Sequence, residues 1–371
     1  MFPWVTVETL TPQAMSIATV GYGSRGFADC RRVLQRLLAK TPALYDGITT
    51  LGLAEIVRSV RDRAEDVEFE IATRSGRYEL LARPVFGPAG DVHAVRLWAG
   101  AGSDPVPAAG GAVGVVWDLA TQTLRIPSGI TSLTGIQADE YVPTMSIAEL
   151  FHRVPTFDRH AEVLDLLYDP RSGDKLQCDV TVAQRAGRPG RWRITARARA
   201  DARTYGAWLL IEDITAGDAP LTWMTLERAG LREAHRRAGT HLAVVQVEHT
   251  SISHWLTEPA PWIRWNYLFR PVDVFHPDDR ERLAATRQPL QSGECAELIL
   301  RMLDYRGGYT PTSVSLFPYP GYANQQLVIA QLRPVELASV ADVDSHTGAG
   351  PLGYDDHLQR AMALREPNSV R

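Results

Sequence analysis

The sequence has few cysteines and no long apolar run. Cys30, Cys178 and Cys295 lie far apart, and no CxxC pair occurs. So sparse and odd a count argues against a disulfide framework and against a zinc knuckle. No apolar stretch approaches the roughly 20 residues that cross a bilayer. The first ten residues also lack the basic and apolar regions of a signal peptide. These absences predict a cytoplasmic, reduced protein without membrane insertion.

The charge is nearly balanced. The chain has 39 basic and 43 acidic residues, for a net charge of −4, and only Lys40 and Lys175 are lysines. A charge so near neutral argues against broad nucleic-acid binding. With 371 residues, 45% of them hydrophobic and 22% charged, the chain has the composition of a globular protein and room for two or three domains.

Familiar catalytic signatures are missing. The chain contains no GxSxG elbow, no HExxH and no P-loop. His235 lies in a charged segment, and no ATP-binding region follows it, so phosphotransfer is disfavoured. The sequence therefore predicts no catalytic residue and no enzyme.

What the chain does have is a weak internal repeat of about 115 residues. A basic residue or glycine followed by an aromatic residue opens a strand-like segment three times, at Arg77-Tyr78, Arg191-Trp192 and Gly308-Tyr309. A period this long indicates duplicated domains, because solenoid repeats are much shorter.

Similar strand patterns surround each of these anchors. Alternating segments precede them at residues 67–73, 176–183 and 296–303, and apolar strands follow at residues 92–98, 207–211 and 326–332. Alternation of this kind predicts antiparallel strands with one buried face.

The repeat predicts an α+β fold of three tandem modules. Each is expected to have a five-stranded antiparallel sheet with helices on one face. The predicted domain boundaries are 1–100, 113–216 and 221–335, with an Ala/Gly/Pro-rich linker at 101–112 and a tail at 336–371.

The second and third units resemble PAS domains. The second unit has Trp117-Asp118, Leu133-Thr134-Gly135 and the closing Ile211-Glu212-Asp213-Ile214-Thr215, and the third has Phe275-His276-Pro277-Asp278-Asp279-Arg280. The first unit resembles PAS or GAF domains more loosely. Its opening, with Trp4 and Val7-Glu8-Thr9-Leu10, is similar to uncharacterised mycobacterial and related actinobacterial proteins that combine such domains without an enzymatic output domain.

This resemblance implies a sensory, signalling or scaffolding role. PAS and GAF domains sense small molecules or mediate association, so the expected partners are a small-molecule ligand, a protein partner or a second copy of the chain. The alternative is a purely structural adaptor whose PAS cores are filled with side chains.

If a ligand cavity exists, the second unit is the favoured host. Trp117, Arg125, Trp192 and Trp208 are the candidate ligand-binding residues, because they fall on predicted sheet strands and indole rings stack on planar ligands. A filled aromatic core is the commoner outcome for such residues. The cofactor remains unknown. Haem and flavin are disfavoured because the sequence offers neither a clear axial histidine nor a reactive-cysteine motif.

Two motifs suggest other chemistry. Gly21-Tyr22-Gly23-Ser24-Arg25-Gly26 matches GxGxxG between a predicted strand and a helix expected at residues 27–39. A nucleotide-binding enzyme using the Gly21–Gly26 turn is therefore a second alternative. His276 to Asp279 contains metal-ligand residue types, yet a proline and two aspartates are also typical of a helix start, which is the favoured interpretation.

The lead segment of the third unit has two interpretations. Residues 221–237 combine apolar side chains with charged ones. The apolar ones are Leu221, Met224, Leu226 and Leu231, and the charged ones are Arg228, Arg232, Glu233, Arg236 and Arg237. We expect a helix that caps its own sheet, with a signalling or dimerisation helix as the alternative. Trp255, Trp262 and Trp265 are expected in a loop packed over helices, or in an exposed interface.

Overall fold

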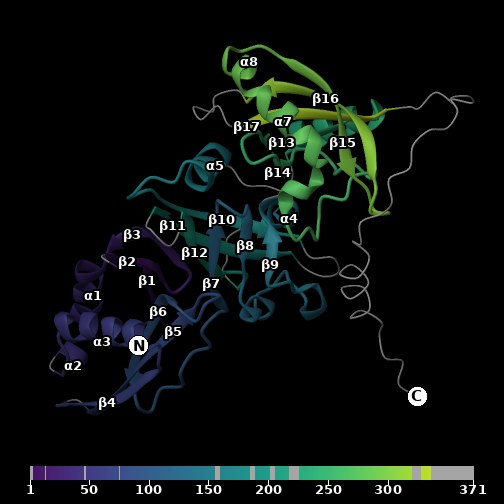
Figure 1. The fold of residues 1–371 in the computed structure, drawn as a ribbon. Helices are drawn as coiled ribbons and strands as arrows, with labels where there is room; N and C mark the ends of the chain where they lie inside the picture. The colour runs from purple at the N-terminus through teal and green to yellow at the C-terminus, as the bar shows by residue number, and fades with distance from the viewer. Residues whose placement is uncertain are drawn as a thin grey trace, which may run out of the picture. The chain divides into compact units, whose positions relative to one another are not determined.

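A computed structural model shows three antiparallel β-sheets with helices packed against them (Figure 1). It describes residues 3–12, 14–45, 47–74, 76–154, 159–183, 189–200, 205–216, 225–319 and 327–335. The expected tail at 336–371 therefore lies outside the described residues. The described residues up to Pro334 belong to one compact unit.

The first sheet has six strands in the order β3-β2-β1-β6-β5-β4. They are β1 (Val5–Thr11), β2 (Ala14–Val20), β3 (Gly23–Asp29), β4 (Val67–Thr73), β5 (Gly76–Phe86) and β6 (Val92–Ala101). The helices α1 (Cys30–Ala39), α2 (Pro42–Tyr45) and α3 (Thr50–Arg63) lie between β3 and β4 in the chain. Helix α1 buries Cys30, Leu34 and Leu38, whose four-residue spacing makes one apolar stripe against the sheet.

The second sheet also has six strands, in the order β10-β11-β12-β7-β8-β9. They are β7 (Ala112–Asp118), β8 (Thr123–Arg125), β9 (Thr144–Ser146), β10 (Lys175–Val182), β11 (Gly190–Ala200) and β12 (Tyr205–Asp213). Its helices are η1 (Ser128–Ser132), η2 (Ala138–Glu140), α4 (Ile147–Arg153) and α5 (His160–Tyr168).

The third sheet has five strands, in the order β14-β13-β17-β16-β15. They are β13 (His241–Gln246), β14 (Ser251–Trp255), β15 (Ala296–Leu303), β16 (Tyr309–Pro318) and β17 (Leu327–Pro334). The helices are α6 (Leu226–Arg237), η3 (Pro271–Val274), α7 (Pro277–Ala285) and α8 (Arg287–Gln291).

The three sheets share one strand order. In each, the last strand pairs on one side with the first strand of the opening hairpin and on the other side with the strand before it in the chain. That preceding strand then pairs with the one before it. The three anchors open or lie near the start of the corresponding strands β5, β11 and β16, as the repeat predicts. The prediction of five strands is right for the third sheet and wrong for the other two, where β3 and β9 add an edge strand.

Helix α6 begins at Leu226 and has no buried side chain, yet it contacts β13 of its own sheet. Residues 221–224 of the expected helix lie outside the described residues.

The loop expected to carry three tryptophans carries two, because Trp255 is the last residue of β14. Trp255 and Trp265 are buried in the third core and Trp262 packs against it, in line with the core-packing interpretation.

The first two sheets pack against each other through the faces that their helices leave open. Along β12, Ala207, Leu209 and Ile211 join the second core, whereas Trp208 and Leu210 join a separate cluster. The first sheet contributes Leu10, Ala18, Val85 and Ala94 to that cluster. Both faces of the second sheet are therefore covered, one by its helices and the other by the first sheet.

Elements of the second and third units also touch. Helix α4 lies against β14, and Tyr168 Oη donates to Ser253 Oγ at 2.7 Å. Val244 and Leu327 of the third sheet belong to the core of the second. No helix in the described part of the chain is long and apolar enough to span a membrane.

A histidine fills a slot between the first two sheets. His93 of β6 is fully buried, stacks on Trp208 with ring centroids 4.4 Å apart, and places Nδ1 2.8 Å from the Leu209 carbonyl oxygen. A methyl group added at Gly87 or Gly114 would collide with its ring. These two glycines are required because they leave room for an imidazole.

We expect Gly114→Ala to destabilise the protein by about 1–3 kcal/mol, since the added methyl group overpacks the slot. The loss should shrink when His93→Ala removes the ring. Gly230→Ala is the matched control, because its new methyl group meets nothing within 4 Å and alanine favours the helix. Urea unfolding measures all four variants, and equal costs of Gly114→Ala with and without His93 would contradict this packing.

Candidate functional site

The four predicted ligand-binding residues do not share one site. Trp117 and Trp192 are fully buried in the second core. Trp208 lies on the opposite face of the same sheet, against the first sheet, and Arg125 is exposed on β8.

The two buried tryptophans take part in a filled core. Trp117 Nε1 donates to the Leu167 carbonyl and Trp192 Nε1 to the Thr134 carbonyl, each at 2.8 Å. The Trp117 ring meets Tyr168 edge to face, with centroids 5.8 Å apart, and burial raises the pKa of Tyr168. Both indole N–H groups are therefore already satisfied by backbone, as expected of structural aromatics.

The glycine-rich turn lies in a β-hairpin. Strand β3 begins within the motif, at Gly23, and pairs antiparallel with β2. The expected strand–turn–helix arrangement is therefore wrong, and the helix begins only at Cys30. Gly26 N donates to Gln177 Oε1 at 2.9 Å, and the Tyr22 carbonyl accepts from Arg193 Nη1 at 2.8 Å. The Gly26 N–H, a donor that a phosphate would use, is thus engaged by the second sheet.

The His276–Asp279 segment starts a helix, as the favoured interpretation predicts. His276 caps α7 and Pro277 is its first residue. Asp279 accepts hydrogen bonds from the Arg301 guanidinium, which lower its pKa to about 2. Among the residues described, no group of three or more His, Cys, Asp or Glu side chains could hold a metal ion.

The most constrained polar group lies between the first two sheets. Glu8 on β1 is fully buried, and its Oε1 accepts from Arg197 of β11 at 2.9 Å from Nε and 2.6 Å from Nη2. Ser16 Oγ donates to the same carboxylate, and Leu10 N donates to Oε2 at 3.1 Å. The Arg197 guanidinium also lies over the Phe27 ring, 4.8 Å from its centroid. Both oxygens of the buried Glu8 carboxylate therefore accept hydrogen bonds, as burial of a charge requires.

A second buried carboxylate at this interface belongs to the second sheet and binds side chains of the first. Glu212 of β12 accepts from Thr6 Oγ1 at 2.6 Å and from Thr19 Oγ1 at 2.9 Å. Arg96 Nη2 lies 3.9 Å from the carboxylate. Burial lowers the pKa of Arg96, and the nearby charge of Glu212 opposes that shift.

Sequence reasoning missed this interface. Alternate positions of β11 carry Arg191, Arg193, Arg197 and Arg199, a pattern that ordinarily indicates a solvent-facing side. The first three are buried instead, and Arg199 lies over the Trp208 ring, 4.0 Å from its centroid. Glu8, a carboxylate inside an otherwise apolar strand, could have indicated a buried ion pair, because a buried charge needs a partner.

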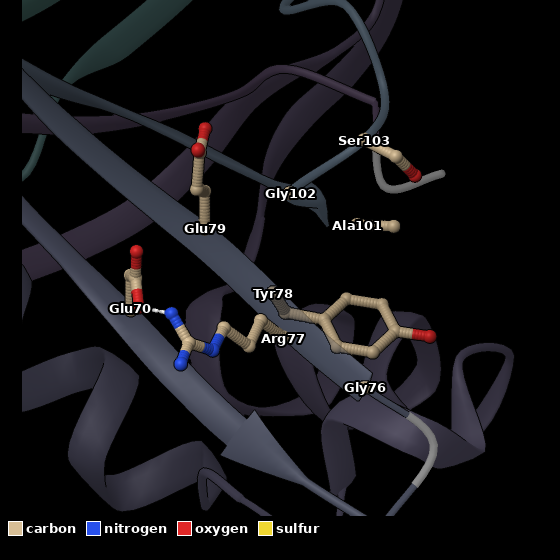
Figure 2. Close-up of a pocket in the computed structure, with 8 residues that line it drawn as sticks. All are labelled: Glu70, Gly76, Arg77, Tyr78, Glu79, Ala101, Gly102 and Ser103. Carbon is tan, nitrogen blue, oxygen red and sulfur yellow. Dashed lines mark hydrogen bonds and ion pairs between the residues drawn. The ribbon is translucent and has the colours of Figure 1, made fainter.

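An open groove lies at the end of β4, β5 and β6 in the first sheet. Its volume is about 390 Å³, and it includes the repeat anchor Arg77-Tyr78. Arg77 Nη1 lies 3.5 Å from Glu70 Oε2 on the neighbouring strand, whereas the Tyr78 ring points away from that pair (Figure 2). The remaining lining residues are Gly76, Glu79, Ala101, Gly102 and Ser103. The groove combines charged groups with one aromatic ring and falls within the size range of small-molecule sites.

Two family models match the chain. The Rv3651-like N-terminal model covers residues 3–108, and the Rv3651-like C-terminal domain model covers residues 229–318. Together they account for just over half of the chain. The chain belongs to the Rv3651-like family.

The Rv3651-like N-terminal match contains the whole first sheet, and the C-terminal match runs from α6 into β16. The second sheet lies between the two matches. No curated protein matches the chain.

A solved structure has the same fold as this chain. The chain is similar to an uncharacterised protein from Mycobacterium tuberculosis, with a TM-score of 0.71 and 17% identity over 90% of this chain and 96% of that one. This likeness shows a shared fold. Two further matches have TM-scores too low to support an argument. One is an RNA-binding Light-Oxygen-Voltage receptor, with a TM-score of 0.23 and 12% identity over 60% of this chain and 95% of that one. The other is a sensory box histidine kinase/response regulator from Burkholderia thailandensis E264, with a TM-score of 0.24 and 14% identity over 35% of this chain and 91% of that one.

We expect Arg197→Met to cost about 3–5 kcal/mol of unfolding free energy, because it leaves the Glu8 carboxylate buried without its cation. Adding Glu8→Gln should restore part of the loss. Arg171→Met, which removes an exposed pair with Asp169, should cost far less, because solvent screens that pair. Urea unfolding measures each variant, and similar losses for the Arg197 and Arg171 variants would contradict the assignment.

A carboxylate between the second and third units should make stability depend on pH. Glu149 accepts from Tyr267 N at 3.1 Å, and burial raises its pKa above the ordinary 4.5. The folded state therefore holds this proton more tightly than the unfolded state, and stability falls as pH rises above about 4.5. We expect wild type to lose stability relative to Glu149→Gln over that range in urea unfolding.

Asp279→Asn is the control of opposite sign. The lowered pKa of Asp279 means that its contribution is complete above 3.8 and is lost as pH falls toward about 2. For Glu149, the prediction fails if the wild type becomes more stable than Glu149→Gln as pH rises, because a raised pKa requires the opposite trend.

Proposed function

We propose that this Rv3651-like protein is a non-catalytic sensory or scaffolding protein built from three PAS-like modules. The repeated strand order of its three sheets supports a triplicated module. The PAS-like segments at Ile211–Thr215 and Phe275–Arg280 close a strand and start a helix, respectively. Family membership is consistent with this proposal and names no ligand.

The filled second core is the observation that carries the proposal furthest. Trp117, Trp192 and Tyr168 occupy the interior where a ligand was expected, and their polar atoms have partners there. Binding is therefore assigned to surfaces and to the groove of the first sheet. This arrangement favours the scaffold over a sensor with a ligand inside its second module.

The groove has a direct structural connection to the second module. Strand β5 contributes Glu79 to the groove and Val85 to the inter-sheet cluster. A ligand that shifts the first sheet would act on the Glu8–Arg197 contact, and so alter surfaces of the second module by population shift. A second copy of the chain is a further partner compatible with the exposed helix α6.

A nucleotide-binding enzyme is the competing function. Its basis is the Gly21–Gly26 turn, whose Gly26 N–H and Tyr22 carbonyl are engaged by Gln177 and Arg193. Equilibrium dialysis with NAD(P) and ATP separates the two proposals, because retention at millimolar ligand would contradict ours.

We expect any small molecule that stabilises the protein to bind in the groove. Thermal shift and native mass spectrometry across a metabolite and cofactor panel will detect it, since a ligand at 100 times its Kd adds about 2.7 kcal/mol. Glu79→Gln should abolish the shift. The exposed Glu68→Gln, outside the groove on β4, should not. Stabilisation that survives Glu79→Gln would place the ligand elsewhere, and the absence of any ligand would favour the adaptor.

A further inference from the structure

Three aromatic side chains of the third unit face solvent within one small region. Tyr267 is 47% exposed, Phe269 92% and Tyr305 57%. Tyr267 and Phe269 come from the loop before η3, and Tyr305 comes from the turn between β15 and β16. We refer to Tyr267, Phe269 and Tyr305 as the aromatic surface.

The loop and the turn are joined by hydrogen bonds. Arg264 N donates to the Leu303 carbonyl at 2.8 Å. Tyr305 Oη lies 3.5 Å from Asn266 Oδ1. The two segments therefore run side by side, with the exposed Tyr305 beside the loop that carries Tyr267 and Phe269.

The loop is anchored from below. Trp265 and Leu268 are buried in the third core, while Tyr267 and Phe269 point outward. Tyr267 has a φ of +54°, a conformation that costs free energy for a non-glycine residue. Its N–H donates to the buried Glu149 of α4 at 3.1 Å, which holds that conformation. The outward aromatic rings are thus positioned by a fixed backbone.

Arg264, Arg306 and the Asp304 carboxylate belong to the two segments that carry these rings. Among the described residues, Arg264 and Arg306 make no ion pair, and the charge of Arg264 acts on Tyr305. The nearby Asp304 carboxylate accepts from Arg306 N at 2.8 Å and from Gly308 N at 3.0 Å within its own turn. The surface therefore offers aromatic rings and guanidinium groups, the residue types that dominate binding energy in protein interfaces.

We propose that the aromatic surface binds an acidic segment of a partner protein that carries an aromatic or aliphatic side chain. The apolar side chain would pack on Phe269 and Tyr305, and its carboxylates would pair with Arg264 and Arg306. A membrane surface is the less favoured occupant, because two arginines fall short of the clusters of roughly four to eight basic residues that recognise anionic lipid. The proposal rests on the scaffolding role above and names the chemistry of its partner.

A randomised peptide library selected on the full chain tests this proposal. We expect enrichment of acidic peptides with an aromatic or aliphatic residue. Fluorescence polarisation of a selected peptide should show binding weakened about tenfold or more by Phe269→Ser or Tyr305→Ser. Arg264→Ser should weaken peptide binding more at low salt than at high salt, because salt screens the attraction between the guanidinium and the peptide carboxylates.

Leu226→Ser is the matched control, because Leu226 is 85% exposed on α6 and lies outside the aromatic surface. Selected peptides that bind the Phe269 variant as well as wild type would overturn the proposal. So would a failure to enrich any acidic peptide, or Phe269-dependent binding to phosphatidylserine vesicles in its place. Catalytic turnover would defeat the proposed function without changing this peptide result, so the two failures are distinguishable.

Discussion

The Glu8–Arg197 ion pair is the contact on which the pairing of the first two sheets depends. A carboxylate with no exposed surface lies inside an apolar strand, and the guanidinium that neutralises it comes from a residue 189 positions later. Removing either charge alone would leave the other buried without compensation. The ion pair therefore specifies one partner face for each sheet, while Leu10, Ala18, Val85, Ala94 and Leu210 supply the apolar contact around it. Because the second sheet has helices on its other face, this docking leaves it covered on both sides.

The alternation that surrounds each anchor predicted most of the fold. It located β4 and β15 to the residue and β10 to within one, because a half-buried strand must alternate and a turn must interrupt it. The two additional edge strands were harder to foresee. Strand β3 carries Gly23, Ser24 and Gly26, a composition that reads as a loop, and only its pairing with β2 makes it a strand. Propensity is weak evidence where a neighbouring strand supplies the hydrogen bonds.

The candidate site could be predicted only in part. Trp117 and Trp192 were correctly assigned to sheet strands, yet strand assignment does not say whether an indole lines a cavity or fills it. Trp208 was grouped with them although its even position along β12 places it on the other face. The arginines of β11 were not foreseen as buried, because their partners Glu8 and Tyr22 lie in another module. The alternation of arginines along β11 is the same whether that face meets solvent or another module, so the pattern alone does not reveal the contact.

If the Glu8–Arg197 ion pair docks the first two sheets, they should open together, and native-state amide hydrogen exchange tests this most directly. We expect the buried amides of β1, β6, β11 and β12 to share one opening free energy, and Arg197→Met to lower it in all four strands. Exchange that accelerates in β11 alone, with the first sheet unchanged, would contradict it.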